Sequence, residues 1–149
     1  MKKVFVMLFA VVIAASAWAK PSPSPAENEK VMAAFQQKFG EATHVSWTEK
    51  EGYFVVSFKL NNDRMLVWYT PEGEVEAVHR SIQTNQLTFL AAETVDKLMQ
   101  DKALLNLAEI SKDGELFYLA KIEEEKFISV YKISASGDYT RVDKTKKKK

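Results

Sequence analysis

The amino-acid sequence predicts an α+β fold of two tandem units, each a helix followed by a four-stranded antiparallel meander. Three observations support this prediction. Apolar and polar residues alternate from Val45 to Tyr69, and two turn-like breaks divide this stretch into three strands. A segment with apolar residues at helical spacing comes before it. The second half of the chain then repeats this order at an offset of 62 residues.

The first 19 residues have the pattern of a secretory signal peptide. Two lysines precede the apolar run Val4–Ala15, and Ala17–Ala19 provides the small-x-small pattern of a cleavage site. The run is shorter than the roughly 20 residues that a membrane-spanning helix needs, so an uncleaved membrane anchor is the less favoured alternative. We therefore expect a mature protein that begins at Lys20, is periplasmic or secreted, and keeps no stable membrane anchor.

A leader rich in proline and serine covers residues 20–25, and the folded domain is predicted for residues 26–143. Its first helix is expected over Glu27–Phe39, because acidic residues lie in the first turn and Gly40 follows the last apolar position. The apolar face of this helix is expected to pack on the sheet. It consists of Val31, Met32, Ala34, Phe35 and Phe39.

The strands within Val45–Tyr69 are expected to sort their side chains onto two faces. This prediction takes Glu49–Gly52 as a four-residue loop and Asn61–Asn62 as a two-residue turn. A bulge at Gly52 would flip the first strand, and with it the side chain of Trp47. The expected core face holds Val45, Trp47, Phe54, Val56, Phe58, Leu60, Met65, Val67 and Tyr69. The opposite, mixed face holds Ser46, Thr48, Tyr53, Val55, Ser57, Lys59, Arg64, Leu66 and Trp68.

The first unit, residues 26–82, is completed by the turn Thr70–Glu74 and a fourth strand, Val75–Arg80. Ser81–Leu90 is a connector without a clear period. The second unit, residues 91–143, is expected to contain one helix, Ala91–Lys102, and the strands Leu105–Ile110, Glu115–Ile122, Lys126–Ile133 and Asp138–Asp143. The basic residues 144–149 are expected to form a disordered, solubilising tail.

The repeat aligns Val45 with Leu107, Gly52 with Gly114, and Tyr69 with Tyr131. One such unit alone would leave a face of its sheet in contact with water. Pairing of the two units is therefore expected to stabilise both.

Core and turn positions between Glu27 and Ile82 carry a family resemblance. They are Val31, Ala34, Phe35, Phe39, Ala42, Val45, Trp47, Phe54, Val56, Phe58, Met65, Val67, Tyr69 and Gly73. Through them the first unit resembles the PepSY-like family of exported Bacteroidetes proteins, which is also labelled beta-lactamase-inhibitor-like. Gly40 stands where that family usually has a proline. The resemblance implies export and tandem helix-plus-sheet units, but shape alone does not imply inhibition.

Composition and motifs argue against a catalytic or metal site. The chain has no cysteine, no G-x-S-x-G or S-x-x-K pattern and no glycine-rich phosphate loop. His44 and His79 are expected on the first and fourth strands, too far apart to share a metal, and the side chains of Glu123–Glu125 point in different directions. We therefore expect no enzyme activity, no cofactor and no bound metal.

Charge argues against a nucleic-acid partner. Without the lysines near its two ends the chain keeps 14 basic against 20 acidic residues, a net charge of about −6. An acidic body of this kind is poorly suited to bind nucleic acid.

The predicted binding site lies on the mixed face of the first sheet. Tyr53 and Trp68 form its aromatic pair, Leu66 its apolar centre, and Arg64 with Lys59 its polar rim. Burial of this face by the second unit or the connector is the competing interpretation.

We expect a non-catalytic module that binds a protein or peptide of the periplasm or exterior through this face. The alternative is a small-ligand carrier or sensor of the cell envelope, with its ligand in an apolar cavity between sheet and helix.

Overall fold

The computed structural model describes residues 28–148. The predicted signal peptide, its cleavage site and the leader lie outside these residues. The elements, in chain order, are α1 (Glu29–Phe39), β1 (Thr43–Lys50), β2 (Tyr53–Leu60), β3 (Asp63–Tyr69), β4 (Val75–Ser81), the 3-10 helix η2 (Thr84–Gln86), α2 (Phe89–Met99), β5 (Ala103–Lys112), β6 (Glu115–Glu123), β7 (Phe127–Ser134) and β8 (Tyr139–Lys146).

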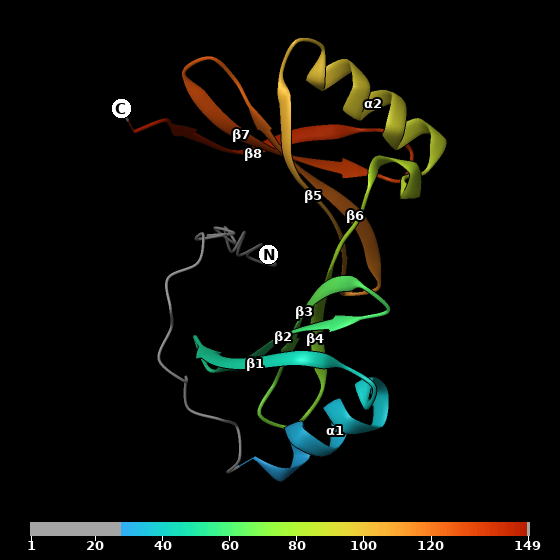
Figure 1. Ribbon diagram of the computed structural model, residues 1–149, viewed down its shortest axis with the longest axis vertical. Coiled ribbons are helices and arrows are strands. Elements are labelled where there is room, and N and C mark those ends of the chain that lie inside the picture. The colour runs from blue at the N-terminus through green and yellow to red at the C-terminus, as the bar shows by residue number, and fades with distance from the viewer. Residues whose placement is uncertain (1–27, 149) are drawn as a thin grey trace, which may run out of the picture.

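The strands form one eight-stranded antiparallel sheet in the order β1 to β8, so each strand pairs with its neighbours in the chain. The helices α1 and α2 lie at opposite ends of the long axis, with the twisted sheet between them (Figure 1). The predicted α+β class is therefore confirmed. β4 pairs with β5, so the sheet continues from edge to edge between the first four strands and the last four.

Helix α1 is fixed at its start by Asn28. The side-chain oxygen of Asn28 accepts a hydrogen bond from the backbone N–H of Val31 at 3.2 Å, which satisfies a donor that the helix leaves unpaired. Its side-chain nitrogen donates to the carbonyl of Pro71 at 2.9 Å. The helix start is thus tied to the turn between β3 and β4.

The buried face of α1 covers an aromatic core. The ring of Phe35 lies 5.3 Å from that of Phe58 and 5.2 Å from that of Trp47, both edge-on, which is a favoured aromatic geometry. Val67 and Phe58 are buried, as predicted, whereas Trp47 and Phe54 are half-buried at its margin. Trp47 therefore does lie on the core face.

The first strand differs from the prediction in two places. His44 has a φ of 55° and the pairing register shifts between Thr43 and Ser46, which is a bulge. Val45 lies in this bulge on the edge strand and is 41% exposed, so it does not belong to the core as predicted. The expected four-residue loop is a two-residue turn over residues 51–52, because β1 extends to Lys50. The turn at Asn61–Asn62 is confirmed.

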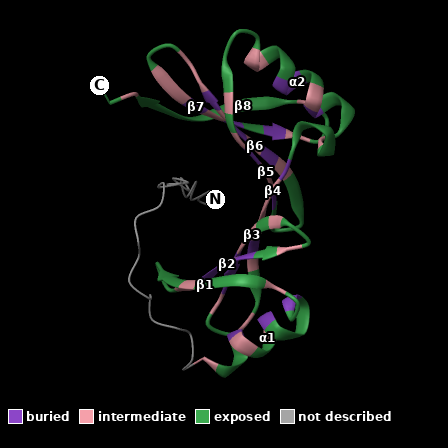
Figure 2. Ribbon diagram, viewed as in Figure 1, coloured by how far each residue is buried: buried purple, intermediate pink, exposed green. Residues whose placement is uncertain are grey.

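The second core forms beneath α2. The helix begins after Thr88, whose side chain accepts a hydrogen bond from the N–H of Ala91. Ala91 and Val95 are fully buried against Leu107 and neighbouring strand residues. Buried residues accordingly lie on the sheet-facing sides of both helices and on the inner strands (Figure 2).

Lys144, Lys146 and Lys147 are not part of a disordered tail, in contrast to the sequence prediction. Lys144 pairs with Ser129 and Lys146 with Phe127, so both belong to β8. The Lys147 ammonium lies 2.8 Å from a carboxylate oxygen of Glu123. Pairing with β7 extends the sheet into this segment.

Other element limits differ by a few residues. The connector contains η2, and α2 begins at Phe89 and ends at Met99. β5 begins at Ala103 and reaches Lys112, which leaves a two-residue turn at residues 113–114 where Asp113 and Gly114 both have positive φ. Turns of this kind match the twist of the strands that they join.

Candidate functional site

The face of the sheet that points away from α1 and α2 is called the open face here. Directly paired residues share a face, so the register assigns its members across β2 to β6. They are Tyr53, Val55, Ser57 and Lys59; Arg64, Leu66 and Trp68; Ala77, His79 and Ser81; Asn106, Ala108, Ile110 and Lys112; and Glu115, Phe117, Leu119, Lys121 and Glu123.

The open face has an apolar cluster of its own. Val55, Trp68 and Ala77 are buried, and Tyr53 and Leu66 pack against them half-buried. All five are strand residues, whereas the two helices contribute to separate cores. The cluster therefore belongs to the open face.

Trp68 is more buried than we expected for an aromatic residue that contacts a partner. It is 6% exposed, and its ring lies 6.2 Å from that of Tyr53 in an edge-on arrangement. The ammonium of Lys50 lies 5.7 Å from the Trp68 ring centroid, within cation–π distance. Tyr53 and Leu66 thus offer more accessible surface than Trp68.

The predicted polar rim lies beside this cluster. Lys59 and Arg64 are directly opposite each other on β2 and β3, and both are exposed. All five predicted site residues therefore share one face of two adjacent strands.

The predicted site is confined to β2 and β3, whereas the open face continues through β4 into β5 and β6. Leu66 is opposite His79, which is opposite Ile110, which in turn is opposite Phe117. This row crosses the β4–β5 junction without a break. Alternation within β5 and β6 indicates the face of each residue, but only the edge-to-edge junction aligns them with Leu66.

His79 lies in the middle of this row. Burial lowers its pKa from the ordinary value of 6.5, because a low-dielectric environment disfavours the charged imidazolium. His44 is an exposed bulge residue of β1, and its Nδ1 is 3.3 Å from the hydroxyl of Thr43. The two histidines are on β1 and β4, as predicted.

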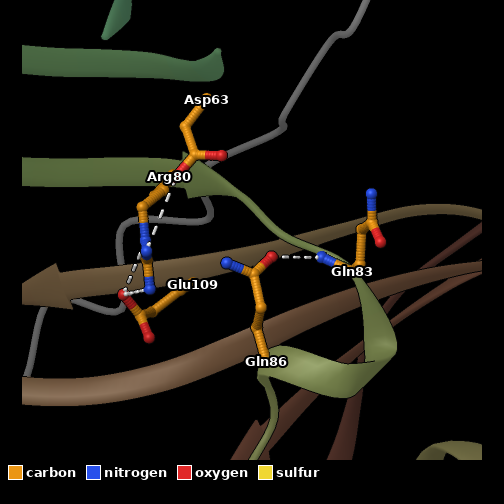
Figure 3. A network of polar contacts seen from close by, with 5 residues as sticks. All are labelled: Asp63, Arg80, Gln83, Gln86 and Glu109. Atoms are coloured by element: carbon orange, nitrogen blue, oxygen red, sulfur yellow. Dashed lines mark hydrogen bonds and ion pairs between the residues drawn. The ribbon is translucent and has the colours of Figure 1, made fainter. Parts of the chain in front are cut away.

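The opposite side of the sheet carries an ionic network at the β4–β5 junction. The Arg80 guanidinium donates twice to Oε1 of Glu109, at 3.2 and 3.0 Å, and lies 3.6 Å from a carboxylate oxygen of Asp63 (Figure 3). Gln83 and Gln86 form a separate backbone-to-side-chain contact nearby. The guanidinium therefore connects β3, β4 and β5.

Within residues 28–148, no group of three or more His, Asp or Glu side chains is placed to hold a metal ion. In the same part of the chain, neither helix is long and apolar enough to cross a membrane.

Comparison with known proteins shows the fold. Neither the models of protein families nor the curated proteins give a match. Among solved structures, a BLIP-like protein from Bacteroides fragilis NCTC 9343 matches with a TM-score of 0.70 at 12% identity, over 89% of this chain and 92% of the other. A DUF2874 family protein from Bacteroides ovatus ATCC 8483 has a TM-score of 0.69 at 14% identity, over 83% and 90%.

A third similar structure, from Bacteroides eggerthii DSM 20697, is provisionally named periplasmic. Its TM-score is 0.70 at 13% identity, over 80% of this chain and 88% of the other. These similarities agree with the beta-lactamase-inhibitor-like part of the family resemblance, and none of the three names mentions PepSY. The chain therefore shares the fold of BLIP-like and DUF2874 proteins from Bacteroides.

Proposed function

We propose that this protein is an exported, non-catalytic module that binds a protein or peptide through the open face. The observation that carries the proposal is the half-buried pair Tyr53 and Leu66 on a cluster built only from strand residues. Aromatic and apolar side chains on a rigid sheet lose little conformational entropy when a partner binds. The BLIP-like name of a protein with the same fold supports binding as its role.

The five predicted residues divide into two roles within this proposal. Tyr53 and Leu66 contact the partner, while Lys59 and Arg64 form a polar rim. Trp68 supports the contact surface from below, because it is 6% exposed. A substitution of Trp68 would therefore lower stability as well as binding, and it does not separate the two effects.

Capture of partners from a periplasmic extract tests the proposal through Leu66→Ala and Tyr53→Ala. Each variant is expected to weaken the captured complex by at least about 2 kcal/mol, as for an interface hot spot. Leu98→Ala is the matched control, because Leu98 is a half-buried leucine that packs beneath α2 on the other side of the sheet. Binding that both open-face variants retain would contradict the proposal.

Export is proposed from the first 19 residues, and the name of the Bacteroides eggerthii protein supports a periplasmic location. The mass of the protein isolated from its native host is expected to correspond to a chain that begins at Lys20. A protein that retains Met1 would contradict cleavage.

We also propose that the two units are copies of one ancestral PepSY-like unit. Supporting this, Asn28 and Thr88 cap the helices in the same way, and each donates to the carbonyl of a β-turn residue, Pro71 or Ala135. Gly73 and Gly137 likewise approach the carbonyl of the second residue of α1 and of α2. Related chains with closer identity between the halves would test the proposal.

A further inference from the structure

The open face is basic although the chain around it is acidic. Residues 28–143 carry 13 basic and 19 acidic side chains. Six of the basic residues lie on the open face by register or by ring contact: Lys50, Lys59, Arg64, Lys112, Lys121 and Lys132. By register or by contact the face has four acidic residues: Glu115, Glu123 and Asp143 on its β6–β8 side, and Glu76 of β4, whose carboxylate lies 3.2 Å from the Lys112 ammonium.

The charge on the β2–β3 side of the open face is entirely positive. Lys59 is directly opposite Arg64, and like charges at opposed positions of a sheet are destabilising. Within the described residues, neither they nor Lys50 has a carboxylate within 4.0 Å. A carboxylate from a partner would relieve this repulsion.

Of the carboxylates near the centre of the sheet, Glu76 is engaged with Lys112 on the open face, and two others are on the opposite side. Asp63 and Glu109 both contact Arg80. The helices add further acidic side chains there, among them Glu29 and Glu93. A polyanion that wraps around the protein would meet these charges, whereas a partner confined to the open face would not.

We infer that the open face binds an acidic protein segment whose carboxylates lie at Lys59 and Arg64 and whose apolar side chains cover Tyr53 and Leu66. This inference rests on the proposed function and specifies the chemistry of its partner. A polypeptide supplies carboxylates and apolar groups together. An anionic polysaccharide lacks the apolar groups that Tyr53 and Leu66 would bury.

The test uses two ten-residue peptides as probes, one alternating phenylalanine with glutamate and the other alternating phenylalanine with lysine. Binding is measured by isothermal titration calorimetry with the full chain at low and high salt. The glutamate peptide is expected to bind at least about tenfold more tightly at low salt, and the ratio is expected to fall as salt screens the charges.

Charge-reversal variants test whether Lys59 and Arg64 cause the preference for the glutamate peptide. Lys59→Glu with Arg64→Glu is expected to abolish the preference for the glutamate peptide. Lys30→Glu with Lys97→Glu changes the net charge equally on the exposed surfaces of the two helices and is expected to preserve it. If the reversed open-face variant does not fold, Lys59→Gln with Arg64→Gln serves the same purpose, because both side chains are exposed.

The outcomes separate this inference from the proposed function. If both peptides bind equally and Leu66→Ala weakens both, the face binds peptides but the acidic preference is wrong. If neither peptide binds, or Leu66→Ala changes neither affinity, both proposals fail. A preference that persists after charge reversal at Lys59 and Arg64 would also overturn the inference.

Discussion

At the scale of single residues, Tyr69 and Tyr131 show how the same side chain can have opposite energetic roles. Both tyrosines are buried, but the Tyr131 hydroxyl donates to Glu124 at 3.2 Å, while the Tyr69 hydroxyl has no partner among the described residues. Burial raises the pKa of Tyr69 to about 12, so it stays protonated over the physiological range.

Tyr69→Phe is therefore expected to leave the free energy of unfolding unchanged or to raise it by up to about 1 kcal/mol. Removing a buried hydroxyl without a partner also removes the cost of its desolvation. Tyr131→Phe is the matched control and is expected to lower stability by about 1 kcal/mol, since it deletes a hydrogen bond to a carboxylate. Urea unfolding of the two variants checks both values. A larger loss in Tyr69→Phe than in Tyr131→Phe would contradict this reasoning.

His79 predicts a pH dependence of stability. Burial lowers its pKa in the folded protein, so the unfolded chain binds a proton first as the pH falls through 6.5. The contribution of His79 to stability is therefore complete above pH 6.5. It declines as the pH falls below that value and levels off beneath the lowered pKa of the folded state.

His79→Gln is expected to reduce the slope of unfolding free energy against pH in this window. The measurement is urea unfolding at closely spaced pH values, with His44→Gln at the exposed bulge of β1 as the control. An unchanged slope in His79→Gln would show that a group other than His79 causes the pH dependence of stability.

At the scale of elements, the turn between β3 and β4 is shaped by its contact with α1. Gly73 has a φ of +87°, and a Cβ built on it would be 2.9 Å from the carbonyl oxygen of Lys30. Gly52, in the β1–β2 turn, has a similar φ of +82° but nothing within 4 Å of its Cβ position. Substitutions at the two glycines therefore distinguish the cost of backbone strain from the cost of steric contact.

Gly52→Ala is expected to cost about 1–2 kcal/mol, the penalty of a left-handed conformation for a residue with a side chain. Gly73→Ala is expected to cost about 1–3 kcal/mol more, because the added methyl group must displace backbone of α1. Thermal unfolding of the two variants measures the difference. Equal losses of stability in the two variants would mean that the backbone of α1 shifts to accommodate the added methyl group without a cost.

Sequence periodicity predicted these elements well because each depends on local chemistry. The alternation in β2 and β3 and the turn at Asn61–Asn62 specify strands, faces and register together. The exposure of Val45 could not be predicted in this way, because the bulge at His44 interrupts alternation without a glycine or proline to mark it. The lysines of β8 were missed for a different reason: their charge is typical of a tail, and pairing with β7 overrides it.

At the scale of the whole molecule, Arg80 joins β3, β4 and β5 at the middle of the sheet. Its guanidinium makes two hydrogen bonds to Glu109, whose side chain is 21% exposed. The Lys132–Glu115 pair, at 4.0 Å and with side chains 44% and 76% exposed, provides a contrast. Exposed pairs of that kind contribute little, because water and salt screen them.

A double-mutant cycle of Arg80→Ala and Glu109→Ala is expected to give a coupling free energy of about 1 kcal/mol or more. The cycle of Lys132→Ala and Glu115→Ala is expected to give a value near zero. Chemical unfolding at two salt concentrations measures both. Equal coupling free energies in the two cycles would show that the Arg80–Glu109 pair does not stabilise the β4–β5 junction.

Only part of the candidate site could be predicted from the sequence, because the rest depends on the arrangement of the whole sheet. Tyr53, Leu66, Trp68, Lys59 and Arg64 lie on adjacent strands, so local alternation places them on one face. The continuation through His79, Ile110 and Phe117 depends on how β4 meets β5, which periodicity within a strand does not specify. The burial of Trp68 depends on the side chains around it rather than on its own strand.

The pairing of every strand with its neighbour in the chain also bears on how fast the protein folds. Contacts between adjacent hairpins close short loops, and domains rich in such contacts fold faster than those with long-range strand pairing. Each helix precedes the strands that it covers, and no crossover must form before the next strand can add. A chain of this design can assemble hairpin by hairpin, without waiting for disulfides, and this would suit the proposed export, after which the chain would have to acquire its structure on the far side of the membrane.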